Sequence, residues 1–552
     1  MRSAGHPDGT REEARQLPPV PATDIIVHPL AAKVKALPRA GSVRQPAPER
    51  YLASRGRPAY SPGHHLLETE PSMPVETPRF LRGTVPAHLQ RPMATLQPFL
   101  ARPGKPTVDI PRLERELDGI ARVLPMIEVR SPEHWIEAVE GLGPEVDAII
   151  PVSVPAYPTE VWNSNPEPLV KRKLPVVFWP LMEYDEPDFW RWSARDMLQA
   201  LGVKVHLVPS IADGKTLIRA LATRRFLSDS RMVVFGEQNF PWNATSAGHL
   251  VTRHLGTRID VLPLSAFRDR RASITEAAVR QAWDAHSARF VRKDVRPEEL
   301  DTAIRTYLSI RSILEERRAF AFGVNCYGDL IIKGGRDVPC LAQAFLREDG
   351  YIASCDGDFL AMESMAFASV FLDSACMMSN MYPVSYEGAL RDHFGDALSP
   401  DAFPRERWKN MARLGHCAFV GIVPPEMTPS GKAALRDFGG TYEIHRDGRG
   451  CGMDSDLRAD TPATAIELKF DGRTLVAAGL KVVETSRHPH PHCETTALLE
   501  FEDLPALVRN ISREHVVVLY GDHVHQFGIL ADVLDLRFIP CGRPHEALEV
   551  RA

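Results

Sequence analysis

The sequence lacks several features that mark common protein classes. No apolar run approaches the length of about 18 residues that a membrane span needs, and the first residues lack the apolar core of a secretory signal. No cysteine occurs before Cys326, and the eight cysteines form no CxxC pair. We therefore expect a cytoplasmic protein that does not contact a membrane and whose cysteines are reduced and mostly buried.

Familiar catalytic motifs are also missing. The chain has no GxSxG elbow and no HExxH helix, which argues against a serine hydrolase and a zincin. The stretch ADGKT at 212–216 lacks the earlier glycine that a phosphate-binding loop requires. The 66 Lys and Arg residues against 71 Asp and Glu give a net charge of -5, so no overall positive field attracts nucleic acid. A small polar molecule is the expected partner.

Composition and apolar patterning divide the chain into four parts. Residues 1–100 hold 16 of the 47 prolines, which predicts an extended tail over 1–104. Short apolar runs that alternate with amphipathic segments predict βαβ units and a mostly parallel sheet in an αβα domain over 105–320. We expect a helix at 297–318 to lead into a second α/β domain over 321–425. Strand-like runs such as TALLEFE and HVVVLYG predict a β-rich domain over 426–552.

Polar residues with useful chemistry follow predicted strands in the second half. Asp356 and Asp358, in SCDGD, lie between a short apolar strand and a helix predicted over 358–374. Ligands bind at such strand ends in α/β folds, although either aspartate could equally be an ordinary helix N-cap. His416, in LGHC, precedes the apolar run AFVGIV, and His515 begins a predicted strand.

Further imidazoles and carboxylates occur near these segments. Asp522 and His523 lie at the far end of the strand that His515 begins. Carboxylates and imidazoles that converge from separate elements are typical of a divalent metal site. The run HPHPHC, which includes His492 and Cys493, has two readings. Its prolines exclude a central strand, so it either lines a polar cleft or binds zinc.

The order of these motifs resembles a known family. CxGD, a helix, MMSNMYPV, GHC and EHVVVLYGDH follow one another as in the L-fucose isomerase and L-arabinose isomerase superfamily, over roughly 105–545. The resemblance implies flavodoxin-like αβα domains with parallel sheets, followed by a C-terminal antiparallel β-rich domain. It also implies a homo-oligomer, a sugar substrate and a divalent metal, typically Mn²⁺.

The family's metal ligands are a glutamate, an aspartate and a histidine, which fall here on Asp356, Asn380 and His515. We expect catalysis to rest on Asp356, Asp358 and His416, of which His416 corresponds to a further cleft histidine of the family. We expect four residues to contact the substrate: His416, His492, Asp522 and His523. Two ligand positions depart from the family pattern. Asp for Glu shortens the reach by one methylene, and Asn for Asp removes a charge and a base.

These departures leave the function open between three hypotheses. The first is a metal-dependent isomerase that interconverts an aldose and a ketose through an enediolate, which needs a base and a Lewis acid. The second is a sugar-binding relative that has lost the catalytic base. The third and weakest is a zinc-dependent hydrolase or lyase that uses the HPHPHC run.

Overall fold

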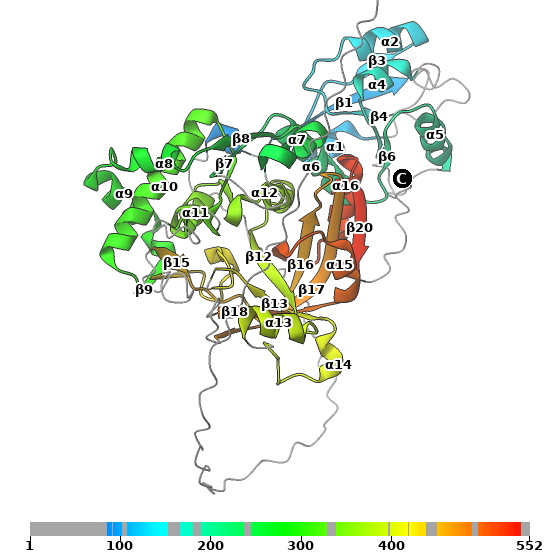
Figure 1. Cartoon of the computed structure of the whole chain (residues 1–552). Coiled ribbons are helices and arrows are strands. Elements are labelled where there is room, and N and C mark those ends of the chain that lie inside the picture. Colours follow the sequence, from blue (N-terminus) through cyan, green and yellow to red (C-terminus); the bar gives the residue numbers. More distant parts are fainter. Residues whose placement is uncertain are drawn as a thin grey trace, which may run out of the picture. The chain divides into compact units, whose positions relative to one another are not determined.

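The computed structural model describes residues 86–90, 92–101, 108–152, 166–179, 189–236, 244–327, 330, 338–395, 398–417, 419–437, 450–487 and 495–542. These residues form an α/β fold with two parallel sheets and a C-terminal antiparallel sheet (Figure 1). The fold class expected from the sequence is therefore confirmed. Residues 1–85, which make up most of the predicted tail, lie outside the described residues.

The first parallel sheet is flavodoxin-like. Its order is β2-β1-β4-β5-β6. The strand β3 also pairs with β1, along the part of β1 that follows its pairing with β2. The elements are η1 (Ala87–Leu89), β1 (Ala94–Ala101), α1 (Ile110–Glu116), β2 (Ala121–Val123), β3 (Ile127–Val129), α2 (Pro132–Glu140), β4 (Ala148–Pro151), α4 (Glu167–Arg172), β5 (Val176–Phe178), α5 (Phe189–Ala200), β6 (Val205–Leu207) and α6 (Ile211–Ser228).

The tail boundary at residue 104 is wrong, because β1 is a fully buried inner strand of this sheet. Proline content suggested an extended tail, yet Pro98 lies inside β1. Leu96 pairs with Val123, the last residue of β2, and Phe99 pairs with Ile127, the first residue of β3. Pro98 therefore faces the gap between β2 and β3. A strand tolerates proline where no neighbour needs the missing N–H.

The second parallel sheet has the order β11-β10-β7-β8. The elements of this part of the chain, among which β9 belongs to another sheet, are β7 (Arg231–Phe235), α7 (Ala244–Leu255), β8 (Arg258–Leu262), α8 (Ser265–Arg271), α9 (Glu276–His286), η2 (Ser287–Arg289), β9 (Phe290–Asp294), α10 (Pro297–Arg317), β10 (Ala321–Val324), α11 (Cys340–Glu348), β11 (Ile352–Ser354), η4 (Cys355–Gly357), α12 (Phe359–Ala366) and the π-helical turn η5 (Phe367–Phe371).

The domain boundary at residue 320 is also wrong. The helix expected at 297–318 exists as α10, but it connects two strands of one sheet, because β10 pairs with β7 as well as with β11. The second α/β unit therefore includes β7 and β8. Periodicity identified the helix but contained no information about which strands it joins.

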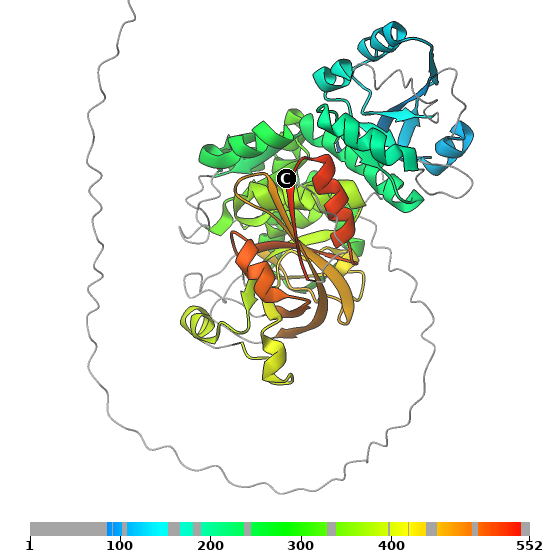
Figure 2. The same ribbon diagram turned by 90° about the vertical axis from the view of Figure 1, so that its right-hand side faces the viewer.

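The C-terminal sheet closes into a barrel. Six antiparallel strands follow the order β16-β19-β12-β13-β18-β17, and pairing of β16 with β17 closes the ring. Parallel β20 and the helix α16 lie against β17 (Figure 2). The elements are β12 (Cys376–Pro383), α13 (Glu387–Phe394), α14 (Arg405–Trp408), β13 (Met411–Gly415), η6 (Pro425–Met427), β14 (Ala433–Asp437), β15 (Cys451–Met453), β16 (Thr461–Leu468), β17 (Thr474–Arg487), β18 (Thr495–Phe501), α15 (Leu504–Asn510), β19 (His515–Tyr520), α16 (Val524–Val533) and β20 (Arg537–Cys541).

The barrel includes β12 and β13, so the boundary expected at residue 425 lies too late in the chain. The small sheet β15-β14-β9 joins a segment between the barrel strands to the second α/β unit. Among the described residues, seven cysteines are free thiols, five of them buried, as expected. Within the same residues, no helix combines the length and apolar character that a membrane crossing requires.

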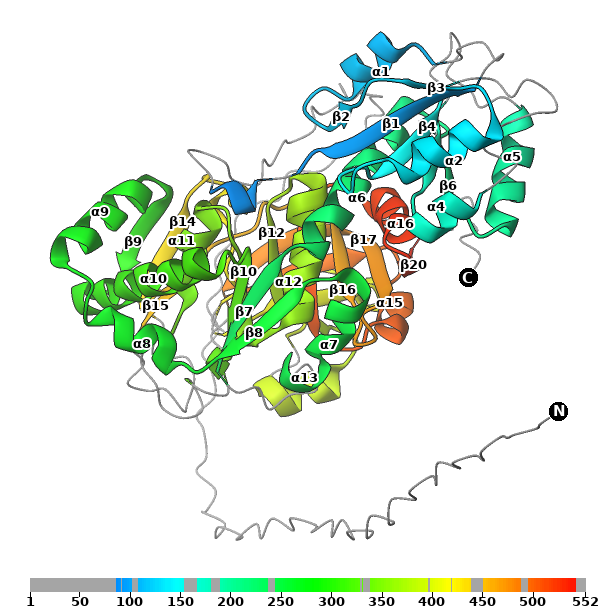
Figure 3. The ribbon, with the colours of Figure 1, turned by 90° about the horizontal axis from the view of Figure 1, so that it is seen from above.

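The helix α12 connects the second sheet to the barrel. All eight of its residues are buried, and it contacts β10 and β11 on one side and β16, β12 and β19 on the other (Figure 3). Six of its eight residues are apolar, the exceptions being Glu363 and Ser364, and a helix that is apolar on nearly every face must be buried in this way. Because α12 begins directly after Asp358, its N-terminus brings the SCDGD segment to the outer wall of the barrel.

Candidate metal centre

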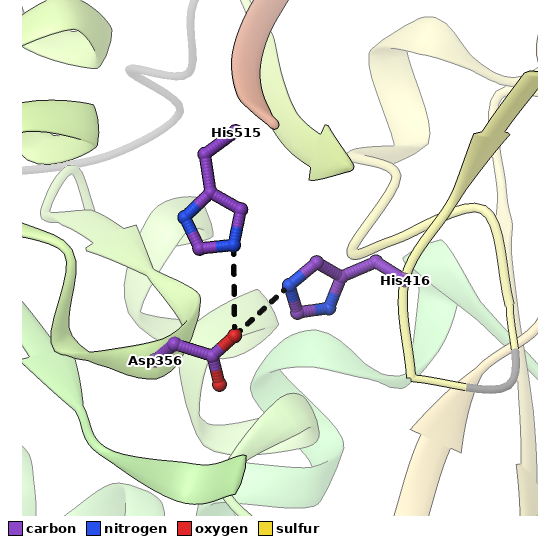
Figure 4. Close-up of side chains that lie close together, drawn as sticks. All are labelled: Asp356, His416 and His515. Carbon is purple, nitrogen blue, oxygen red and sulfur yellow. Dashed lines mark ion pairs between the residues drawn. The ribbon is translucent and has the colours of Figure 1, made fainter. Parts of the chain in front are cut away.

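Three buried side chains from distant segments converge at one point. Asp356, His416 and His515 each offer a ligand atom, and these atoms all lie within 4.8 Å of one another. Oδ2 of Asp356 lies 3.3 Å from Nε2 of His416 and 3.6 Å from Nε2 of His515 (Figure 4). The side chains of the two histidines are only 2% exposed. The side chain of Asp356 is 11% exposed, so the cluster is largely but not completely shielded from solvent.

Asp356 is positioned by a tight turn after β11. Its φ of 52° and that of Gly357, 63°, are both left-handed, a conformation that aspartate tolerates better than most residues. The turn lies close against β10, because a Cβ on Gly323 would lie only 2.8 Å from Cα of Gly357. Backbone N–H of Tyr327 donates to Oδ1 of Asp356, which leaves Oδ2 directed at the imidazoles.

The two histidines come from neighbouring parts of the barrel. His416 follows β13 and forms a β-bridge with Phe419, while His515 is the first residue of β19. Side chains alternate along β19: Val516 and Val518 belong to the barrel interior, and Val517 packs on the outer face. His515 shares the outer face with Val517, so its ring points toward α12 and Asp356.

Asp358 holds His515 in position. Its Oδ1 accepts hydrogen bonds from the backbone N–H groups of Leu360 and Ala361, so it is the N-cap of α12, the ordinary role considered above. Its Oδ2 bonds Nδ1 of His515 at 2.8 Å and accepts from Nε of Arg513 at 2.8 Å. A carboxylate on one ring nitrogen is the usual partner of a metal-binding histidine, because it leaves Nε2 free for the ion.

Both oxygens of Asp358 are thus occupied, and the side chain is fully buried. Burial by itself raises the pKa of Asp358, but the charge of Arg513 and the bond to His515 outweigh it and hold the pKa well below its usual range. The catalytic role predicted for Asp358 does not fit these contacts. Asp358 is a positioning residue.

The carboxylates and imidazoles of the cluster shift one another's pKa toward the charged forms. Burial raises the pKa of Asp356, but contact with His416 and the charges of both imidazoles lower it to about 2. Burial lowers the pKa of His515, whereas the bond to Asp358 and the charges of Asp358 and Asp356 raise it above its usual value. Without a bound cation, the protein therefore pairs ionised carboxylates with a readily protonated imidazole.

Asn380 lies between the two histidines. On β12 it pairs in register with His515 on one side and with Gly415, which precedes His416, on the other. Its Nδ2 donates to the hydroxyl of Tyr382, at 2.9 Å. Its Oδ1 is buried and makes no hydrogen bond to the described residues. A buried amide oxygen without a donor is costly unless it meets a ligand or a cation.

The other residues expected at this site lie elsewhere. Asp522 and His523 follow the opposite end of β19, about 17 Å from His515 at some 3.4 Å per residue. His523 instead contacts the backbone of Tyr520 and the hydroxyl of Thr464. The structure therefore does not bring Asp522 and His523 to the cluster of Asp356, His416 and His515, and their contact with a substrate stays a prediction. His492, together with the rest of the HPHPHC run, lies outside the described residues.

Sequence reasoning missed Arg513 and its second partner. Arg513 bonds both Asp358 and Glu467, and Glu467 also accepts from the backbone N–H and hydroxyl of Ser512. The available signal was closeness in sequence, since Arg513 lies two residues before His515, in the bend that precedes β19. Glu467 lies in an apolar strand with nothing in its surroundings to mark it.

The donor set suits a divalent transition metal. One carboxylate and two imidazoles favour Mn²⁺, Fe²⁺ or Zn²⁺ over Mg²⁺ and Ca²⁺, which prefer oxygen ligands alone. The orphaned Oδ1 of Asn380 is a candidate fourth donor. The residues present therefore fit the kind of ion that the sequence resemblance implies.

Comparisons with known proteins add little to this geometry. No family model and no curated protein matches the chain. Among solved structures, a putative two-component response regulator/GGDEF domain protein has 14% identity and a TM-score of 0.20, covering 50% of this chain and 99% of its own. A Desulfitobacterium hafniense ABC transporter substrate-binding protein in complex with Leu has 11% identity and a TM-score of 0.13, covering 55% and 78%. At these TM-scores neither likeness carries weight for fold or function.

Proposed function

We propose that this chain is a divalent-metal-dependent enzyme of the sugar isomerase type, which interconverts an aldose and a ketose. The observation that carries the proposal is the convergence of Asp356, His416 and His515. They come from the three segments whose order resembles that of the L-fucose isomerase superfamily, and they form a buried set of metal donors.

Each residue has a distinct part in this proposal. Asp356 and His515 hold the metal, Mn²⁺ by the resemblance, and His416 supplies a third donor that the sequence had assigned to catalysis. When bound, the cation acts as a Lewis acid toward the oxygens of a sugar. Asp358 keeps Nε2 of His515 available by accepting the hydrogen bond at Nδ1. Asn380 supplies its neutral amide oxygen, Oδ1, as a ligand of the cation or as an acceptor for a sugar hydroxyl.

The carboxylates do not supply a strong base. A pKa of about 2 makes Asp356 a weak proton acceptor near neutral pH, and both oxygens of Asp358 are occupied. With asparagine at position 380, no described carboxylate in the cluster suits removal of a proton from carbon. This observation favours the second candidate, a metal-containing sugar-binding protein without isomerase activity.

Two measurements on the full chain separate these candidates. Elemental analysis of the purified protein tests for bound metal, and Mn²⁺ is expected at one ion per chain rather than zinc. NMR then follows the entry of solvent deuterium at C2 of a panel of aldoses. Exchange supports the isomerase, whereas metal and sugar binding without exchange supports the binding protein. If neither the wild-type chain nor Asp356→Ala binds metal, the isomerase and the metal-containing binding protein are both contradicted.

A further inference from the structure

A second candidate site lies at the opposite end of the second parallel sheet. A cavity of about 390 Å³ opens where β7 and β8 begin, between the C-terminal ends of α6 and α10 and the short helix η1. Five arginines and one histidine contribute to its lining: Arg225, Arg231, Arg258, Arg317, Arg318 and His88. The strand β10 runs from this cavity to the turn beside Asp356, so about 20 Å separates the two sites at some 3.3 Å per residue.

The cavity carries more positive than negative charge. Asp260 accepts from both Arg231 and Arg317, and Asp147 pairs with Arg225. Among the described residues, no carboxylate forms an ion pair with Arg258 or Arg318. Five guanidinium groups thus face Asp260, Asp147 and the exposed Asp229. The charge of Glu315 also acts on His88, but Glu315 is paired with Arg311, so a surplus of two positive charges remains. The two helix C-termini contribute about half a negative charge each, which does not cancel this surplus.

The remaining lining groups suit an organic anion. His88 lines the cavity, and its Nε2 has no hydrogen-bond partner among the described residues. Phe226 and Phe320 form an edge-to-face pair, with ring centroids 5.1 Å apart, that adds an apolar wall. Guanidinium groups bind phosphate oxygens in a bidentate manner, and a cavity of this size falls in the range that holds small organic ligands.

We propose that this arginine cavity, defined by the six residues above, binds a small organic phosphate such as a sugar phosphate or a nucleotide. Arg258 and Arg318 supply the unpaired positive charge, and the phenylalanine wall contacts the organic part. A concave site of this volume suits a small molecule better than a nucleic acid chain, and the net charge of -5 disfavours polyanion binding elsewhere.

Calorimetry on the full chain tests the proposal with glucose 6-phosphate, ADP and inorganic phosphate. Glucose and adenosine serve as uncharged counterparts. We expect one equivalent of an organic phosphate to bind, more tightly than inorganic phosphate, and the uncharged counterparts not to bind at this site. The Arg258→Gln/Arg318→Gln variant should weaken binding at least about 100-fold, since each charge-assisted hydrogen bond contributes about tenfold or more.

Two controls locate the binding. The Arg253→Gln/Arg280→Gln variant removes the same charge from exposed arginines outside the cavity and should bind as tightly as the wild type. Asp356→Asn, which alters the metal centre, should also leave phosphate binding unchanged, so this test stands apart from the proposed isomerase. No binding by any phosphate at millimolar concentration would overturn the proposal. Equal affinity of the Arg258→Gln/Arg318→Gln variant and the wild type would do so as well.

Discussion

At the scale of single residues, the most informative position is Asn380. It lies in register between the two histidine segments, and its buried Oδ1 has no donor among the described residues. A carboxylate at this position would face the same surroundings with an added negative charge and an added base. Substitutions at position 380 can therefore test metal binding and proton transfer separately, and no other described residue of the cluster offers this test.

We expect Asn380→Asp to bind Mn²⁺ more tightly than the wild type, because a divalent cation gains from an added anionic oxygen. Any isomerase activity should rise by roughly 10²- to 10⁴-fold if the carboxylate supplies the missing base. Calorimetry and deuterium exchange at C2 measure the two effects. Asn380→Ala is the control and should show neither gain. Equal Mn²⁺ affinity in all three proteins would mean that position 380 does not contact the metal.

The pair of Asp358 and His515 makes metal binding depend on pH. The pKa of His515 is raised above its usual value of about 6.5, so its ring keeps a proton over a wider pH range than a free imidazole. A metal ion must displace that proton. Affinity should therefore be highest above this raised pKa and fall as pH decreases through it, by about tenfold per pH unit for each proton displaced.

Calorimetry in buffers with different ionisation enthalpies counts the protons that Mn²⁺ releases. Asp358→Asn keeps a side chain suited to the N-cap but removes the charge that raises the pKa of His515. In this variant the pH dependence should move to lower pH, and metal affinity should fall about 10- to 100-fold. Glu467→Gln is the matched control, since it alters a partner of Arg513 and leaves the contact of Asp358 with His515 intact. An unchanged pH profile in Asp358→Asn would exclude His515 as a ligand.

At the scale of elements, α12 determines where the site lies. The sequence predicted a helix over 358–374, and the structure has α12 over Phe359–Ala366 followed by the π-helical turn η5 to Phe371. The helix could be predicted because its apolar spacing and the preceding aspartates are local signals. The sequence also identified Asp356, His416 and His515. It did not predict the closed barrel, the sheet shared by β7 and β10, or the Arg513 and Glu467 contacts, because these depend on pairing between distant segments. The sequence did not show that Asp522 lies apart from the cluster for the same reason, because no local signal indicates which end of β19 lies next to α12.

Ser364 connects α12 to the barrel. Its buried hydroxyl accepts from the backbone N–H of Leu468 on β16, at 3.0 Å, and donates to the carbonyl of Leu360. Ser364→Ala should destabilise the protein by about 1–3 kcal/mol, because it leaves a buried N–H without a partner. Ser309→Ala is the control, because the hydroxyl of this buried serine donates only to the carbonyl of Arg305 in its own helix among the interactions described.

Denaturant unfolding measures both serine variants, and calorimetry then measures Mn²⁺ affinity for the folded proteins. Ser364→Ala should lose more stability than Ser309→Ala while its metal affinity stays close to that of the wild type. Equal loss in the two variants would show that the contact between α12 and β16 contributes little.

At the scale of the whole molecule, the proposed metal joins the second α/β unit to the barrel, since Asp356 follows β11 whereas His416 and His515 belong to barrel segments. An ion that binds only the folded chain stabilises it by about 2.7 kcal/mol at a concentration 100 times its Kd. Chelation should therefore lower the Tm of the full chain, and added Mn²⁺ should restore it. In Asp356→Ala, both chelator and Mn²⁺ should leave the Tm unchanged. A wild-type Tm that does not respond to Mn²⁺ would mean that the three side chains form a structural ion-pair cluster, in which the charge of Asp356 is balanced by the imidazoles alone.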